Sequence, residues 1–249
     1  MPLTRYKLTI EYDGTLYAGF QIQKDVKTIA SALTEAIFNV SRESISITCT
    51  GRTDSGVHAE GQVIHFDLEK ILQEYQMVES LNFYLRNEQV VVTKCEIVDQ
   101  NFDARRSSKS KIYRYQILNR HAPSALLANR AWPIKKPLNL NAMIDAAEYL
   151  VGEHDFSSFR ASGCQAKHAI RRLKYIKFSQ NGDLILCHIK GNAFLHNMVR
   201  IIIGSLVEVG LGKWPSDQIK QILAAKDRIT AGQTAPSCGL YLQEILFND

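Results

Sequence analysis

The order in which strand-like and helix-like segments follow one another is the feature that most constrains this fold. Residues 6–12 alternate apolar and polar side chains, which predicts a half-buried strand. After Thr28, a capping residue, residues 29–40 place apolar side chains on one helical face. Two more strands, a helix and a strand are predicted at residues 44–50, 63–66, 77–85 and 90–98. The order βαββαβ is that of the ferredoxin-like motif.

The second half of the chain repeats this order without detectable sequence identity. Its predicted strands and helices lie at residues 112–118, 143–151, 174–180, 184–189, 195–211, from 216 onward, and at 240–246. Asn181-Gly182 separates two of these strands and suits a type I′ hairpin turn. We expect an α+β protein of two ferredoxin-like halves, with antiparallel sheets flanked by helices and approximate twofold symmetry. The halves are residues 1–104 and a basic half, 105–249.

A nine-residue run after the strand at 44–50 is the strongest candidate for chemistry. It reads Gly51-Arg52-Thr53-Asp54-Ser55-Gly56-Val57-His58-Ala59 and sets a carboxylate and a guanidinium two positions apart. Its glycines tolerate the backbone of a tight turn, and a turn held by a packed sheet displays a side chain rigidly. Asp and Ser in such turns often only bind nearby backbone, so the run alone leaves a structural role open.

Motifs along nearly the whole chain resemble the tRNA pseudouridine synthase A family. Besides the nine-residue run they are Tyr12-Asp13-Gly14, Gly19-Phe20-Gln21, Gly61-Gln62-Val63, His65-Phe66, Phe102-Asp103-Ala104-Arg105, Lys111-Ile112-Tyr113-Arg114-Tyr115, His154-Asp155-Phe156-Ser157-Ser158-Phe159, Phe194-Leu195-His196-Asn197-Met198-Val199-Arg200 and Gly239-Leu240-Tyr241-Leu242. Ser55 departs from the usual alanine of the family. Because a hydroxyl replaces a hydrogen there, we expect only fine geometry to change.

The resemblance implies the pseudouridine synthase fold and an isomerase that converts uridine to pseudouridine at positions 38, 39 and 40 of the tRNA anticodon arm. It implies a homodimer, and the reaction demands neither cofactor nor metal. Asp54 matches the family's nucleophile, which attacks C1′ or C6, and Arg52 matches the residue that holds the flipped nucleotide. Tyr113 matches the active-site tyrosine, a catalytic candidate that stacks on the base and could also assist removal of the C5 proton. Arg200 matches the partner of the nucleophile. His58 is expected to be structural.

The net charge of +5 is unevenly distributed along the chain. Residues 1–100 carry 9 Lys and Arg against 14 Asp and Glu, a balance of −5, and the remaining 149 carry 21 against 11, a balance of +10. Two acid-free basic runs, 105–120 and 160–177, are interleaved with tyrosines. Basic runs are often only solvated surface, but cations with aromatic rings favour an RNA-binding face. Arg105, Arg171 and Arg172 are the candidates there.

Other sequence features predict a cytoplasmic protein that has no membrane span. The longest apolar stretch, residues 201–211, is shorter than the roughly 20 residues that a membrane helix needs. The first six residues lack the apolar core of a signal peptide. The five cysteines contain no Cys-x-x-Cys and are odd in number, which is typical of reduced thiols. The seven histidines show no metal-ligand spacing, so we expect no metal.

Two other classes of protein share some of these features. Asp13-Gly14-Thr15 after a strand is similar to the nucleophile loop of haloacid-dehalogenase-type phosphatases, but Glu11 stands where that loop needs an aspartate. A noncatalytic RNA-binding module would also combine ferredoxin-like halves with basic, aromatic faces. Such a module has no need for Asp54 together with Arg52 and Arg200.

Overall fold

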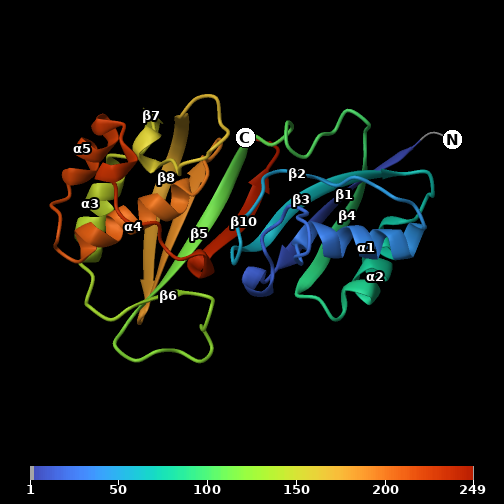
Figure 1. Cartoon of the computed structure of the whole chain (residues 1–249), viewed down its shortest axis with the longest axis horizontal. Coiled ribbons are helices and arrows are strands. Elements are labelled where there is room, and N and C mark those ends of the chain that lie inside the picture. Colours follow the sequence, from blue (N-terminus) through green and yellow to red (C-terminus); the bar gives the residue numbers. More distant parts are fainter. Residues whose placement is uncertain (1–2, 249) are drawn as a thin grey trace. The chain divides into compact units, whose positions relative to one another are not determined.

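A computed structural model describes residues 3–248, which form two compact units (Figure 1). The first unit comprises the described residues up to Lys109 together with those from Tyr241 onward, and the second comprises Ser110–Leu240. Both units combine helices with mostly antiparallel strands. The predicted α+β class is therefore confirmed.

The first unit follows the predicted βαββαβ order. Its elements are β1 (Thr4–Tyr12), α1 (Ile29–Ser41), β2 (Thr48–Cys49), β3 (His58–Leu68), α2 (Glu74–Leu85) and β4 (Val90–Val98), with a short 3-10 turn η1 (Gly14–Leu16) after β1. The strands lie in the order β4-β1-β3, and β2 pairs with β3. β1 is antiparallel to both of its neighbours.

Alternation along β1 produces the core of this unit. Tyr6 and Leu8 are fully buried, and they lie opposite Phe66 and Ile64 of β3. The helices α1 and α2 contact each other and cover this sheet (Figure 1). α1 begins at the predicted residue, because the Thr28 side chain accepts the backbone N–H three residues later in a capping box. The apolar periodicity thus places both helices correctly.

The predicted strand at residues 44–50 is wrong for most of its length, since β2 holds only Thr48 and Cys49. Upstream of β2, hydrogen bonds to a side chain take the place of backbone hydrogen bonds between strands. The Glu43 carboxylate accepts the backbone N–H groups of Glu69 and Lys70, just beyond β3. Local alternation therefore overstates the length of this edge strand.

The second unit contains most of the remaining elements. They are β5 (Ser110–Asn119), β6 (Trp132–Ile134), α3 (Leu140–Glu148), β7 (Gly152–Asp155), β8 (Ile170–Asn181), β9 (Leu184–Gly191), α4 (Met198–Gly210) and α5 (Gln218–Ala225). The strands lie in the order β5-β9-β8-β7 with antiparallel pairing, and β6 runs parallel to β5. α3 contacts both α4 and α5. The short strands β6 and β7 were not predicted.

The predicted hairpin between β8 and β9 is present, but its turn differs from the prediction. Asn181 pairs with Leu184, so the loop residues are Gly182 and Asp183. Of these positions only Gly182, at φ 56°, has a positive φ. A type I′ turn needs positive φ at both loop residues, whereas a glycine at the first loop residue suits type II′. The type I′ prediction is therefore wrong.

The last strand, β10 (Leu240–Leu246), was predicted with the second half of the chain. From Tyr241 onward it belongs to the first unit, where Tyr241 and Leu242 pair in parallel with His58 and Ala59 of β3. The chain end thus reaches the strand that follows the candidate catalytic loop. The division at residues 104 and 105 and the twofold symmetry stay predictions.

Candidate active site

Arg52 and Asp54 share one loop of the first unit, between β2 and β3. Val57 N donates to Asp54 O at 3.1 Å, which closes a turn around Gly56 at φ 74°. Arg52 is exposed and Asp54 is half-buried. The loop therefore displays the predicted carboxylate and guanidinium together.

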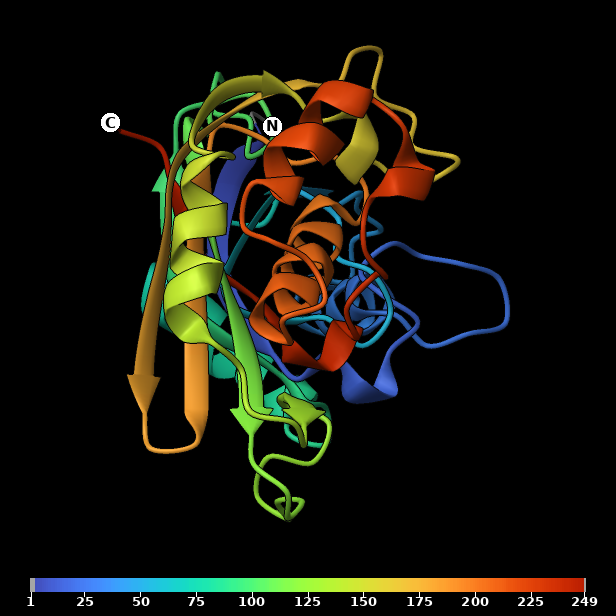
Figure 2. The ribbon, with the colours of Figure 1, turned by 90° about the vertical axis from the view of Figure 1, so that its left-hand side faces the viewer.

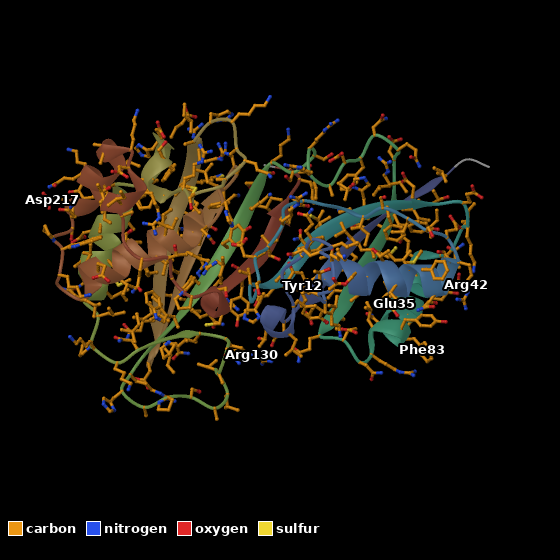
Figure 3. All side chains as sticks on the ribbon, in the orientation of Figure 1. Tyr12, Glu35, Arg42, Phe83, Arg130 and Asp217 are labelled. Atoms are coloured by element: carbon orange, nitrogen blue, oxygen red, sulfur yellow. The ribbon has the colours of Figure 1, made fainter. Side chains whose placement is uncertain are left out.

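A second loop of the same unit, residues 13–20, fixes the backbone next to Asp54. Phe20 N donates to Thr53 O at 3.0 Å. The hydroxyls of Tyr12 and Thr53 form a buried hydrogen bond of 2.8 Å (Tyr12 is labelled in Figure 3). Since Thr53 directly precedes Asp54, these two bonds set the direction in which the chain enters the candidate nucleophile.

Two glycines allow the loops to approach each other this closely. A Cβ on Gly19 would lie 2.9 Å from Thr53 O, and the φ of Gly19 is +95°. A Cβ on Gly14 would collide with the Val57 carbonyl. Both neighbours are backbone atoms, which cannot rotate away as a side chain would. Gly14 and Gly19 therefore allow residues 13–20 to pack against the Asp54 loop, a contact that the sequence does not indicate.

Ser55, the one departure from the family pattern, adds a further tie between the loops. Its Oγ donates to Tyr17 O at 3.2 Å. Alanine could not form this bond. The hydroxyl therefore joins the Asp54 loop to residues 13–20.

His58 and Asp13 complete the support of the loop from its other end. His58 is buried, accepts the Gly14 N–H at Nδ1 over 3.1 Å, and lies 3.1 Å from an Asp13 carboxylate oxygen. Its ring stacks on Tyr241 of β10 with centroids 4.6 Å apart. Asp13 also accepts the Thr15 N–H and so caps η1. Asp13 and His58 therefore hold the loop in place. The sequence motifs do not indicate this structural role of Asp13.

Tyr113 lies in the second unit, on β5. It stands opposite Ile189 of β9 in the strand register. Its ring meets Phe194 edge-to-face, with centroids 5.0 Å apart and planes at 81°. Such aromatic pairs restrict the orientation of a ring, so Phe194 presents Tyr113 in a defined pose.

Arg200 lies in the first turn of α4, and the structure fixes its guanidinium within the second unit. Nε donates to Ala235 O at 2.7 Å, and Nη1 donates to Asn197 Oδ1 at 2.8 Å. Tyr115 donates to the adjacent carbonyl of Pro236 at 2.7 Å. Tyr113 is two residues from Tyr115 and therefore faces the same side of β5. Tyr113 and Arg200 thus belong to one region of this unit.

The three candidate RNA-binding arginines differ in their surroundings. Arg105 and Arg172 are exposed. Arg171 donates from Nη1 to the carbonyls of Ile170 and His168, at 2.6 and 3.1 Å, while its buried Nε has no hydrogen-bond partner among the residues described. Burial lowers the pKa of Arg171. Its guanidinium is therefore engaged by the start of β8, whereas Arg105 and Arg172 point their charge to solvent.

Two absences hold for residues 3–248. No group of three or more His, Cys, Asp and Glu side chains within this range could hold a metal ion. None of the helices described is both long enough and apolar enough to cross a membrane.

Comparison with known proteins establishes the family. A family model described as tRNA pseudouridine synthase matches residues 8–105 and 146–248, which include both loops of the candidate site as well as Arg200. The chain belongs to the tRNA pseudouridine synthase family. It is therefore an isomerase that acts on tRNA, and the predicted pseudouridine synthase family is confirmed. The phosphatase and noncatalytic alternatives are set aside.

Similar curated proteins extend over almost the full length. The chain is 46% identical over 245 residues to tRNA pseudouridine synthase A of Bartonella quintana, which covers 98% of this chain and 99% of that protein. It is 44% identical to the Bartonella henselae protein of the same name, and 43% identical to that of Bartonella bacilliformis, with the same coverage.

Proposed function

We propose that this isomerase converts uridine to pseudouridine at positions 38, 39 and 40 in the anticodon arm of tRNA, with Asp54 as nucleophile. The rigid display of Asp54 carries the proposal. Its neighbour Thr53 is held by a backbone and a side-chain hydrogen bond, and Gly19 packs against the same carbonyl. A reactive group must be held in its productive geometry by its surroundings, and this loop meets that requirement.

The reaction explains why a carboxylate is needed. The bond between C1′ and N1 of uridine breaks, and a bond between C1′ and C5 forms. C5 loses its hydrogen as a proton and N1 gains one, so the formula is unchanged. A carboxylate can attack C1′ of the sugar or C6 of the ring, and glycosidases use carboxylates beside a similar electron-poor sugar carbon.

The other site residues receive separate roles. Tyr113 stacks on the target base, supported by the edge-to-face contact with Phe194. Arg52, exposed on the loop of Asp54, holds the flipped nucleotide. Arg200 is the residue that, by the family resemblance, partners the nucleophile, and its guanidinium supplies a permanent positive charge.

Binding of tRNA is assigned to the basic residues, and the enzyme is proposed to act as a cytoplasmic homodimer without a cofactor. Arg105 and Arg172 are exposed and suit phosphate contacts. Arg171 is bound to backbone carbonyls, so we give it the role of shaping the strand that presents Arg172. The dimer and the location follow from the family resemblance.

Loss of the C5 hydrogen provides the test of this function. The purified protein is incubated with tRNA that carries tritium at C5 of uridine, and released tritium is counted while carbodiimide mapping locates the product. We expect release of tritium and modification confined to positions 38 to 40. Absence of release would contradict the reaction, and product elsewhere in the tRNA would contradict the assigned positions.

A further inference from the structure

A hairpin next to the Asp54 loop exposes two apolar side chains. Gln23 and Val26 form an isolated antiparallel bridge around a two-residue turn, with Asp25 in the left-handed region at φ 60°. Ile22 and Val26 are 56% and 47% exposed. Figure 2 shows the blue segment after η1 as a loop that projects from the first unit. Exposure of two apolar side chains to water is unfavourable, so their burial against a partner would be stabilising.

The base of this hairpin is firmly held. Ala18 N donates to Lys27 O at 2.9 Å, and Gln23 Nε2 donates to Ala18 O at 2.8 Å. Glu88 accepts from the Tyr17 hydroxyl at 2.6 Å and pairs with the Lys27 ammonium at 2.7 Å. The hairpin is therefore pre-organised, and a partner would bind it without ordering a loose loop.

The hairpin arises directly from the support of Asp54. The hairpin begins after Phe20, whose N–H donates to the carbonyl of Thr53, and ends before Thr28, the N-cap of α1. Ile22 follows Phe20 by two residues, so its Cα lies at most about 7 Å beyond it. The exposed side chains are thus within reach of nucleotides that adjoin one bound at Asp54.

Gln23 and Val26 are bridge partners and share one face of the hairpin. From the alternation of an extended chain we infer that Ile22, the neighbour of Gln23, points to the other face. An element that enters between two stacked bases needs an apolar surface on each side. The turn also carries the Lys24 cation, which suits a phosphate, next to the Asp25 carboxylate.

We propose that residues 21–27, the hairpin wedge, insert Ile22 and Val26 into the base stack beside the uridine held at Asp54. This inference rests on the proposed function. Taking a nucleotide out of its stack costs a few kcal/mol, and apolar side chains that fill the gap offset that cost. We assign RNA as the occupant because the hairpin starts beside the Asp54 loop, where the target nucleotide is proposed to bind.

The test replaces both side chains with threonine, in the double variant Ile22→Thr/Val26→Thr. Threonine keeps the branched shape that favours the hairpin backbone but makes the tip polar. The RNA is an anticodon stem-loop with 2-aminopurine beside the target uridine, because the fluorescence of this base rises when its stacking is broken. Binding is measured in an Asp54→Asn background, which isolates insertion from chemistry, and single-turnover conversion is measured with Asp54 intact.

We expect the double variant to lose most of the fluorescence rise and to convert the target about tenfold more slowly. Its affinity for the stem-loop should change by less than about threefold, since phosphate contacts remain. Ile71→Thr is the matched control: Ile71 is 70% exposed in the same unit but lies between β3 and α2. This control should behave as the unchanged protein does.

Two results would overturn the hairpin wedge. One is a double variant with unchanged fluorescence and unchanged conversion. The other is a change of oligomeric state on sedimentation, which would make the hairpin a contact between copies. Failure of the unchanged protein to form pseudouridine would instead contradict the proposed function, so the two failures are distinguishable.

Discussion

At the scale of single residues, the candidate site depends on positions where no side chain fits. Gly19 has a φ of +95°, and a Cβ on it would lie 2.9 Å from the carbonyl oxygen of Thr53, the residue before Asp54. Substitution there would combine backbone strain with a collision. The collision would displace the backbone next to Asp54, whereas backbone strain at a glycine without such a contact would not.

Gly19→Ala should therefore reduce turnover more than its effect on stability explains. Gly163→Ala is the matched control, because Gly163 has a φ of +80° but a Cβ on it would lie more than 4 Å from any described atom beyond its chain neighbours. Each substitution should lower the free energy of unfolding by about 1 kcal/mol or more. Only Gly19→Ala should slow conversion, as measured by single turnover at saturating enzyme. Equal rates for the two variants would show that the close contact does not position Asp54.

His65 predicts a pH dependence of stability. Its Nδ1 accepts the Ala104 N–H at 3.1 Å, and its ring meets Phe102 edge-to-face. Burial, reinforced by the charge of Arg5, lowers the pKa of His65 in the folded protein. The unfolded chain therefore takes up a proton first as the pH falls below about 6.5. This contribution to stability is present above that pH and is lost in more acidic solution.

The check is urea unfolding between pH 5 and pH 8. His65→Asn keeps a side-chain acceptor but removes the titrating group. We expect it to be less stable than the unchanged protein at pH 8 and to lose less stability on acidification. If the two proteins lose stability in parallel, His65 does not contribute to the pH dependence.

At the scale of elements, apolar periodicity predicts those helices and strands that bury a face of their own. β1, α1, α2 and β9 are of this kind. The short strands are defined by distant partners instead: β7 exists because Gly152–Asp155 pairs with β8, and β6 includes Pro133, a residue that disfavours strands. The site divides in the same way. The sequence motifs predict Asp54 and Arg52, but no local pattern indicates that residues 13–20 contact their loop.

The first residues of β8 give a prediction about RNA binding. Arg172 is exposed, while the guanidinium of Arg171 binds two backbone carbonyls. Arg172→Gln should reduce the salt dependence of tRNA affinity by about one ion, without loss of stability. Arg171→Gln should instead lower the free energy of unfolding by about 1 to 2 kcal/mol. Filter binding across a salt series and urea unfolding separate the two; a reversed pattern would contradict this assignment.

At the scale of the whole molecule, the chain end belongs to the unit that bears Asp54. Tyr241 of β10 pairs with β3 and stacks on buried His58, which in turn binds the Gly14 amide. No local pattern in residues 240–246 indicates that partner. The C-terminal strand therefore links the last segment of the sequence to the first unit.

Tyr241→Ala should destabilise the protein by about 3 to 5 kcal/mol, the usual cost of deleting a buried aromatic ring. Tyr75→Ala, at an exposed tyrosine of α2, is the control and should change stability by less than about 0.5 kcal/mol. Urea unfolding measures both. A loss at Tyr241 no larger than at Tyr75 would show that β10 adds nothing to the first unit.

The proposed chemistry is tested most directly by Asp54→Asn, which keeps the shape of the side chain and removes its charge. Glu35→Gln, at an exposed position of α1 labelled in Figure 3, is the matched control. Pseudouridine formation and tRNA affinity are measured for both variants in single-turnover assays. We expect Glu35→Gln to be fully active, and Asp54→Asn to bind tRNA but form no detectable pseudouridine. Retention of a tenth of the rate by Asp54→Asn, a barrier change of only about 1.4 kcal/mol, would contradict its role as nucleophile.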